Sequence, residues 1–186
     1  MLQRQQFLST ADFCDRKRSV ATNGDMVSMH FEITPLHEAR SVKAIFDALQ
    51  TFVYNIEISI SEAVGDITVR ENDDAKPDSP VAQHRLHTLI QNVVQIEANN
   101  VAFAAYDPAG QGGRELGLSV CDAVDEDDLF PYRLLERMRQ DMTMIIQLES
   151  SEDESGMPFV ALTRWWCLRI RKSGIYVPPF AVERII

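Results

Sequence analysis

The sequence predicts an α+β fold, in which one long amphipathic helix packs on a curved antiparallel sheet. Residues 42–56 place apolar side chains three and four positions apart, as a helix requires, whereas about six other segments alternate apolar and polar side chains, as strands do. The later strand segments have no helical stretches between them, which disfavours parallel βαβ winding. With 186 residues, of which 45% are hydrophobic and 25% charged, the chain has the composition of one soluble domain.

The chain is predicted to divide into a flexible basic leader, residues 1–25, and a single α+β domain, residues 26–186. The leader carries four basic and three acidic side chains, a net charge of +1. Because the whole chain carries −10, the domain must carry −11.

The first strand is expected at Met26–Ile33, where apolar and polar residues alternate up to Pro35. Ser41 is a suitable N-cap for the helix, because its hydroxyl can accept a hydrogen bond from the first helical turn. The period then changes, and residues 56–61 alternate again, which predicts that the chain leaves the helix as a strand.

Asn99-Asn100 separates two short apolar segments and is predicted to form a hairpin turn, because asparagine tolerates positive φ. The other elements expected are a strand at 67–69, a loop at 71–80, strands at 118–124, 142–148 and 159–170, a helical turn at 134–139 and a terminal helix at 180–186. A START-like helix-grip topology fits this order of elements, and an NTF2-like cone is the alternative.

The charge and the cysteines exclude several classes of function. A net charge of −10 and a pI near 4.8 repel phosphate, so we expect no direct binding of nucleic acid. Cys14, Cys121 and Cys167 are odd in number and far apart, which encodes neither a disulfide framework nor a zinc site. With neither a signal peptide nor a run of about 20 apolar residues, the chain is expected to be intracellular, nuclear or cytoplasmic, without membrane association.

No motif in the sequence predicts catalysis, and we expect no enzyme, cofactor or metal. The glycines of residues 110–117 lack the spacing of a phosphate loop, and the acidic run 125–128 lacks that of an EF-hand. His84 and His87 would share a face only in a helix and have no third ligand at a typical distance, so a structural or surface role is favoured over metal binding. Ser119 and Cys121 have no nucleophile elbow around them.

Two charges interrupt strand faces that are otherwise apolar. Arg164 shares its face with Trp166 and aliphatic residues, and Asp122 does the same in the 118–124 segment. A charge on a core face is costly unless it is paired. Arg164 and Asp122 are therefore predicted to form a buried ion pair or, together with Trp166, to line a ligand site.

Several segments carry a family resemblance, and they occur here in the family's order: SVKAIFDALQTFVYNIEISISEAVGDITVREND, SPVAQHRL, QIEANNVAFAAY, DAVDEDDLFPYR, ERMRQDMT and ALTRWWCLRI. Across about residues 26–172 the chain resembles the domain C-terminal to the leucine zipper in a group of oomycete bZIP transcription factors. LQRQQFL near the N-terminus is similar to the last turns of such a zipper. The resemblance implies a regulatory or sensor-like α+β module, with no catalytic residues to transfer. This sequence has neither the basic helix that binds DNA in that family nor the leucine heptads that follow it.

Three functions remain open at the level of the sequence. The first is a non-enzymatic regulatory module that binds a small apolar ligand or a protein partner. The second is an interaction module with a filled core, acting as a homo- or heterodimer, and the third is a START-like or NTF2-like enzyme. A cavity of at least about 300 Å³ between helix and sheet would indicate a drug-sized ligand, and a filled core would indicate none.

Overall fold

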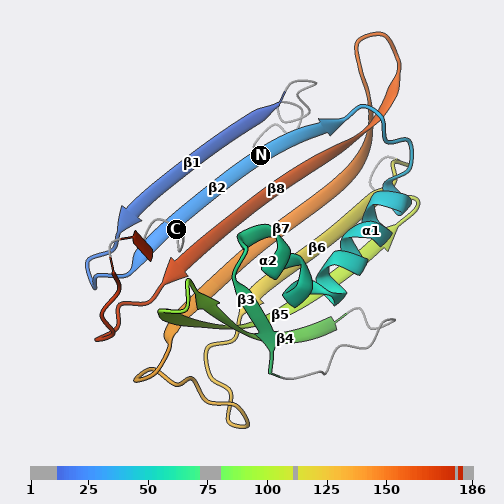
Figure 1. Ribbon diagram of the computed structural model, residues 1–186. Helices are drawn as coiled ribbons and strands as arrows, with labels where there is room; N and C mark the ends of the chain where they lie inside the picture. Colours follow the sequence, from blue (N-terminus) through green and yellow to red (C-terminus); the bar gives the residue numbers. More distant parts are fainter. Residues whose placement is uncertain (1–11, 72–80, 111–112, 179, 182–186) are drawn as a thin grey trace.

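The fold was analysed in a computed structural model that describes residues 12–71, 81–110, 113–178 and 180–181 (Figure 1). Within them the elements follow the order β1 (Phe13–Val20), β2 (Met26–Leu36), α1 (Val42–Tyr54), α2 (Ile56–Val64), β3 (Ile67–Arg70), β4 (Val81–Ile90), β5 (Val94–Asp107), β6 (Leu116–Ala123), β7 (Met138–Glu152) and β8 (Pro158–Ile170).

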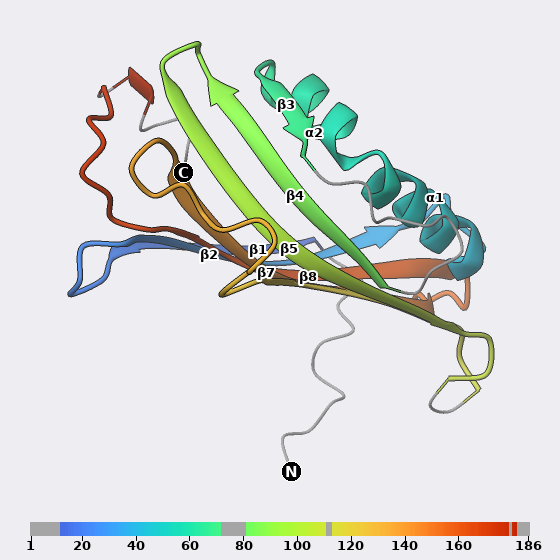
Figure 2. The same cartoon turned by 90° about the horizontal axis from the view of Figure 1, so that it is seen from below.

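All eight strands belong to one sheet, in the order β1-β2-β8-β7-β6-β5-β4-β3. Neighbouring strands are antiparallel, and a short parallel contact joins β5 to β7. Both helices lie on the same side of the sheet (Figure 2). Helix α1 packs on β5, β6 and β7, and its Val42 and Phe46 share a core cluster with Val160 of β8, while α2 packs beside β3 (Figure 1).

The predicted architecture around one long amphipathic helix is wrong, because the molecule is mostly sheet and has two short helices. Asn55 leaves helical geometry, with φ −108° and ψ 36°, and separates α1 from α2. The strand expected at 56–61 is instead helix α2, which ends at Gly65 in the left-handed conformation. Ile56 and Ile60 satisfy both a period of two and the i, i+4 spacing of a helix, so the alternation was ambiguous.

The hairpin predicted at Asn99-Asn100 is also wrong. Strand β5 runs through both asparagines, and the turn lies earlier, at Gln91 and Asn92, whose φ angles are 48° and 58°. Asn99 and Asn100 are buried, at 0% and 4% exposure, one on each face of β5. Their side chains serve the interior of the fold and not a turn.

The leader is partly structured. Residues 13–20, predicted to be flexible, form β1 and pair with β2 along its length. Strands were correctly predicted at β2, β3, β6, β7 and β8, and Ser41 caps α1 by accepting a hydrogen bond of 3.1 Å from the Ala44 amide. Of the helical turn predicted at 134–139, residues 134–136 form a turn, but β7 begins at Met138. LQRQQFL, most of the 71–80 loop and most of the predicted terminal helix lie outside the described residues.

A buried ionic cluster holds the 124–137 loop against the face of the sheet opposite the helices. Arg85 and Glu97, at 3% and 1% exposure, form an ion pair of 3.1 Å on adjacent strands. Glu97 also accepts the Arg133 amide at 2.6 Å, and Arg85 donates to the carbonyl of Pro131. Asp127, part of the acidic run, accepts the side-chain amide of Asn99 at 2.8 Å. These contacts pair the buried charges and fix the loop.

Candidate ligand cavity

A cavity of about 230 Å³ lies between the two helices and the sheet. Val53, Ile56 and Ile60 line it from α1 and α2. On the sheet side its apolar walls come from β4 to β8 and consist of Leu86, Ile90, Ile96, Ala98, Ala102, Met142, Met144 and Leu168. The volume is below the roughly 300 Å³ expected for a drug-sized ligand, yet the core is not filled.

The register between neighbouring strands determines which side chains face the cavity. Alternate residues of a strand point to the same face, so the even-numbered residues of β4, β5, β7 and β8 face the helices. On β6 the register pairs Ala102 with Cys121, which makes the odd-numbered residues face the same way. Small side chains on β5, such as Ala98 and Ala102, leave open space below α2.

One end of the cavity is polar. His84 and Asn100 are directly opposite each other on β4 and β5, and both line the cavity. They are 3% and 4% exposed. Neither ring nitrogen of His84 has a hydrogen-bond partner among the described residues, and neither has the side-chain oxygen of Asn100. Buried polar atoms are usually paired, so this end of the cavity is chemically distinctive.

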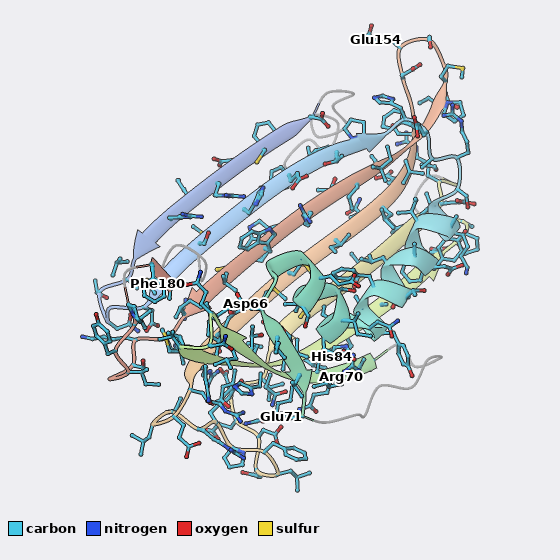
Figure 3. The ribbon with its side chains drawn as sticks, in the orientation of Figure 1. Asp66, Arg70, Glu71, His84, Glu154 and Phe180 are labelled. Atoms are coloured by element: carbon cyan, nitrogen blue, oxygen red, sulfur yellow. The ribbon has the colours of Figure 1, made fainter. Side chains whose placement is uncertain are left out.

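The charge state of His84 follows from its surroundings. Burial lowers its pKa, the nearby Arg70 guanidinium lowers it further, and the Glu57 carboxylate has the opposite effect. Arg70 is itself held by Glu57, with hydrogen bonds of 2.6 and 3.0 Å, and lies near His84 (Figure 3). The His84 imidazole is therefore neutral at neutral pH, with one donor nitrogen and one acceptor nitrogen.

Thr88 and Cys121, which also line the cavity, differ from this end. Thr88 shares a hydrogen bond of 3.0 Å with the hydroxyl of Thr68, so its hydroxyl is already satisfied. Burial raises the pKa of the Cys121 thiol to about 12, so this cysteine is a small apolar group at neutral pH.

The predicted pair of Arg164 and Asp122 does not form. Arg164 faces the helix side of β8 and donates to Glu32, whereas Asp122 is exposed on the other face and accepts from Thr143 at 2.7 Å. Trp166 is half-buried and packs on His30, with ring centroids 5.2 Å apart. None of the three predicted residues lines the cavity.

His84 and Ser119, which were not predicted as site residues, both line the cavity. His84 was overlooked because no strand was assigned to residues 81–90, and Asn100 because it was placed in a turn. An alternating pattern was present in His84, Leu86, Thr88 and Ile90 and would have placed His84 on an inward face.

Within the described part of the chain, no group of three or more His, Cys, Asp or Glu side chains is arranged to hold a metal ion. In the same residues, no helix has the length and apolar character needed to cross a membrane.

Comparison with protein-family models and with curated proteins finds no match. Among solved structures, the chain is similar to the human StarD13 (DLC2) lipid transfer and protein localization domain, with a TM-score of 0.37 and 11% sequence identity. The similarity covers 92% of this chain and 81% of that domain. Likeness at this level establishes neither a fold family nor a ligand for this chain.

Proposed function

We propose that this chain is a non-enzymatic ligand-binding domain that holds a small apolar molecule between its helices and its sheet. The supporting observation is the cavity of about 230 Å³ with predominantly aliphatic and methionine walls. An engineered apolar cavity of about 150 Å³ is enough to bind benzene, so this one suits a molecule of about two fused rings. Its size does not suit an intact sterol or phospholipid.

The test is binding of 2-methylnaphthalene, followed by its intrinsic fluorescence, to the wild type and to two matched variants. Ala102→Leu adds a larger side chain inside the cavity, whereas Ala105→Leu makes the same change on the opposite, exposed face of β5. We expect Ala102→Leu to weaken binding at least about tenfold, because the larger side chain occupies space in the cavity and removes apolar contacts with the ligand. Ala105→Leu should leave binding unchanged.

Urea unfolding of both variants verifies that they are folded. Absence of binding to the wild type, or equal binding by the two variants, would contradict a ligand function for this cavity. Ala98→Leu, at a second cavity position, provides an independent filled variant if Ala102→Leu is unstable.

A second candidate function is self-association through the opposite face of the sheet. Phe103, Val120, Ile145 and Trp165 are successive cross-strand partners on β5, β6, β7 and β8. Phe103 and Ile145 are 47% and 42% exposed, and adjacent apolar side chains of this kind are common in interfaces. Sedimentation of the wild type and of Ile145→Asp tests this function: a dimer that the substitution dissociates supports it, and a monomer at all concentrations contradicts it.

A regulatory role beside a bZIP region is a further part of the proposal and rests on the family resemblance alone. The resemblance covers about residues 26–172, which include every wall of the cavity.

A further inference from the structure

We infer that the ligand of this cavity carries a hydroxyl group, which binds between His84 and Asn100; this inference rests on the proposed function. The two side chains are cross-strand neighbours in the wall of a cavity that is mostly apolar. Their ring nitrogens and amide oxygen are buried without a partner in the described residues. The ligand class is therefore a small amphiphile such as a phenol or a short cyclic alcohol.

The hydrogen-bonding capacity of the pair selects the hydroxyl. A neutral imidazole offers one donor and one acceptor, and the Asn100 oxygen adds an acceptor. A hydroxyl donates one hydrogen bond and accepts others, so it can accept from the N–H of His84 and donate to the side-chain oxygen of Asn100. An ionised carboxylate accepts only and leaves both protein acceptors unpaired in an apolar environment, which is costly.

The charged groups near His84 do not compete for this role. Arg70 on β3 donates to the Glu57 carboxylate and, at 2.6 Å, to the Tyr54 carbonyl. Neither Arg70 nor Glu57 lines the cavity. The Arg70 guanidinium thus bonds groups of α1 and α2. The polar end of the cavity presents the neutral side chains of His84 and Asn100 to a ligand.

Two probes of nearly equal shape test the inference: 2-naphthol, with a hydroxyl, and 2-methylnaphthalene, with a methyl in its place. The measured quantity is the ratio of their dissociation constants, obtained by calorimetry on wild type, His84→Leu, Asn100→Leu and Thr88→Val. Thr88→Val is the matched control, because Thr88 lines the same cavity but its hydroxyl already bonds Thr68.

The expected result is that His84→Leu and Asn100→Leu each reduce the preference for 2-naphthol roughly tenfold, as loss of one hydrogen bond to a buried group predicts. Thr88→Val should preserve the wild-type ratio. If His84→Leu does not fold, His84→Phe retains a ring of similar size without the nitrogens.

The outcomes separate this inference from the proposed function. If both probes bind the wild type and the ratio is the same in all folded variants, the hydroxyl site is wrong while the apolar cavity function stands. If neither probe binds the wild type, both are wrong.

Discussion

Arg164 on β8 donates a hydrogen bond of 2.5 Å to the carboxylate of Glu32 on β2, its direct cross-strand neighbour. This hydrogen bond holds the pKa of Glu32 below its usual range, and a second one from the hydroxyl of Thr34 has the same effect. Arg164 is 39% and Glu32 25% exposed, so water screens the pair. Pairing across this part of the sheet thus joins an early strand to the last one.

The first prediction concerns the strength of this pair. Because Arg164 is more than one third exposed, a double-mutant cycle of Arg164→Met and Glu32→Gln should give a coupling of at most about 1 kcal/mol in urea unfolding. The effects of Arg164→Met and Asp122→Leu should be additive, because these residues lie on opposite faces. A coupling of several kcal/mol between Arg164 and Asp122 would restore the pair that the sequence predicted.

The second prediction is that the buried pair on the opposite face matters much more. Glu97→Gln removes one carboxylate from a buried cluster and leaves the guanidiniums of Arg85 and Arg137 to share the carboxylate of Glu71. Loss of one charge from such a buried cluster costs about 3 to 5 kcal/mol. Glu149→Gln is the control, since its partner Arg114 is 51% exposed and the loss should be below about 1 kcal/mol. Similar unfolding free energies for the two variants would mean that the Arg85–Glu97 pair is open to solvent.

The third prediction is a pH dependence of stability caused by His84. Its pKa in the folded protein is below the ordinary 6.5, so the unfolded state takes up the proton first. Stability is therefore fully present above pH 6.5 and decreases as the pH falls below it, by at most about 1.4 kcal/mol per pH unit for this group. His87, whose pKa burial also lowers, contributes in the same direction.

Urea titrations at about pH 7.5 and about pH 5.5 measure this effect, a range that avoids most carboxyl titration. The loss of stability on acidification should be smaller in His84→Leu than in the wild type. The charged groups that act on His84 are Arg70 and Glu57. An unchanged loss in the variant would show that His84 is accessible to protons in the folded state.

The fourth prediction concerns Gly117, where α1 approaches the sheet. A Cβ atom at this position would lie 3.0 Å from the Phe46 ring and 3.4 Å from Leu148, both in the core under α1. Gly117→Ala should therefore destabilise by about 1 to 3 kcal/mol, as overpacking does. Gly174→Ala has open space around its Cβ and should unfold as the wild type does.

The fifth prediction is selective alkylation of the cysteines. Cys14 is exposed, whereas Cys121 is buried in the cavity wall with its pKa raised to about 12. Only the thiolate reacts, so iodoacetamide at about pH 8 should modify Cys14 and leave Cys121 intact in the folded protein. Peptide mass spectrometry measures both sites, and equal modification would contradict the burial of Cys121.

The sequence predicted the long strands better than the site, for a physical reason. In β2 and β8 one face is apolar over many residues, so the period of two is clear. In β4 and β5 the inward face mixes His84 and Asn100 with aliphatic residues, because it forms the polar end of a cavity. The asparagines that resembled a turn are buried by tertiary contacts, which no local pattern encodes.

The sheet order also sets the timing of assembly in the cell. Strand β2 pairs with β8, yet more than a hundred residues separate Leu36 from Pro158 along the chain. At a synthesis rate of about 5 to 20 residues per second, β8 is completed on the order of ten seconds after the β1–β2 hairpin. During that interval one edge of β2 is available to other chains, and a hairpin alone is only marginally stable. The β1–β2 hairpin therefore lacks its partner strand until β8 has been synthesised.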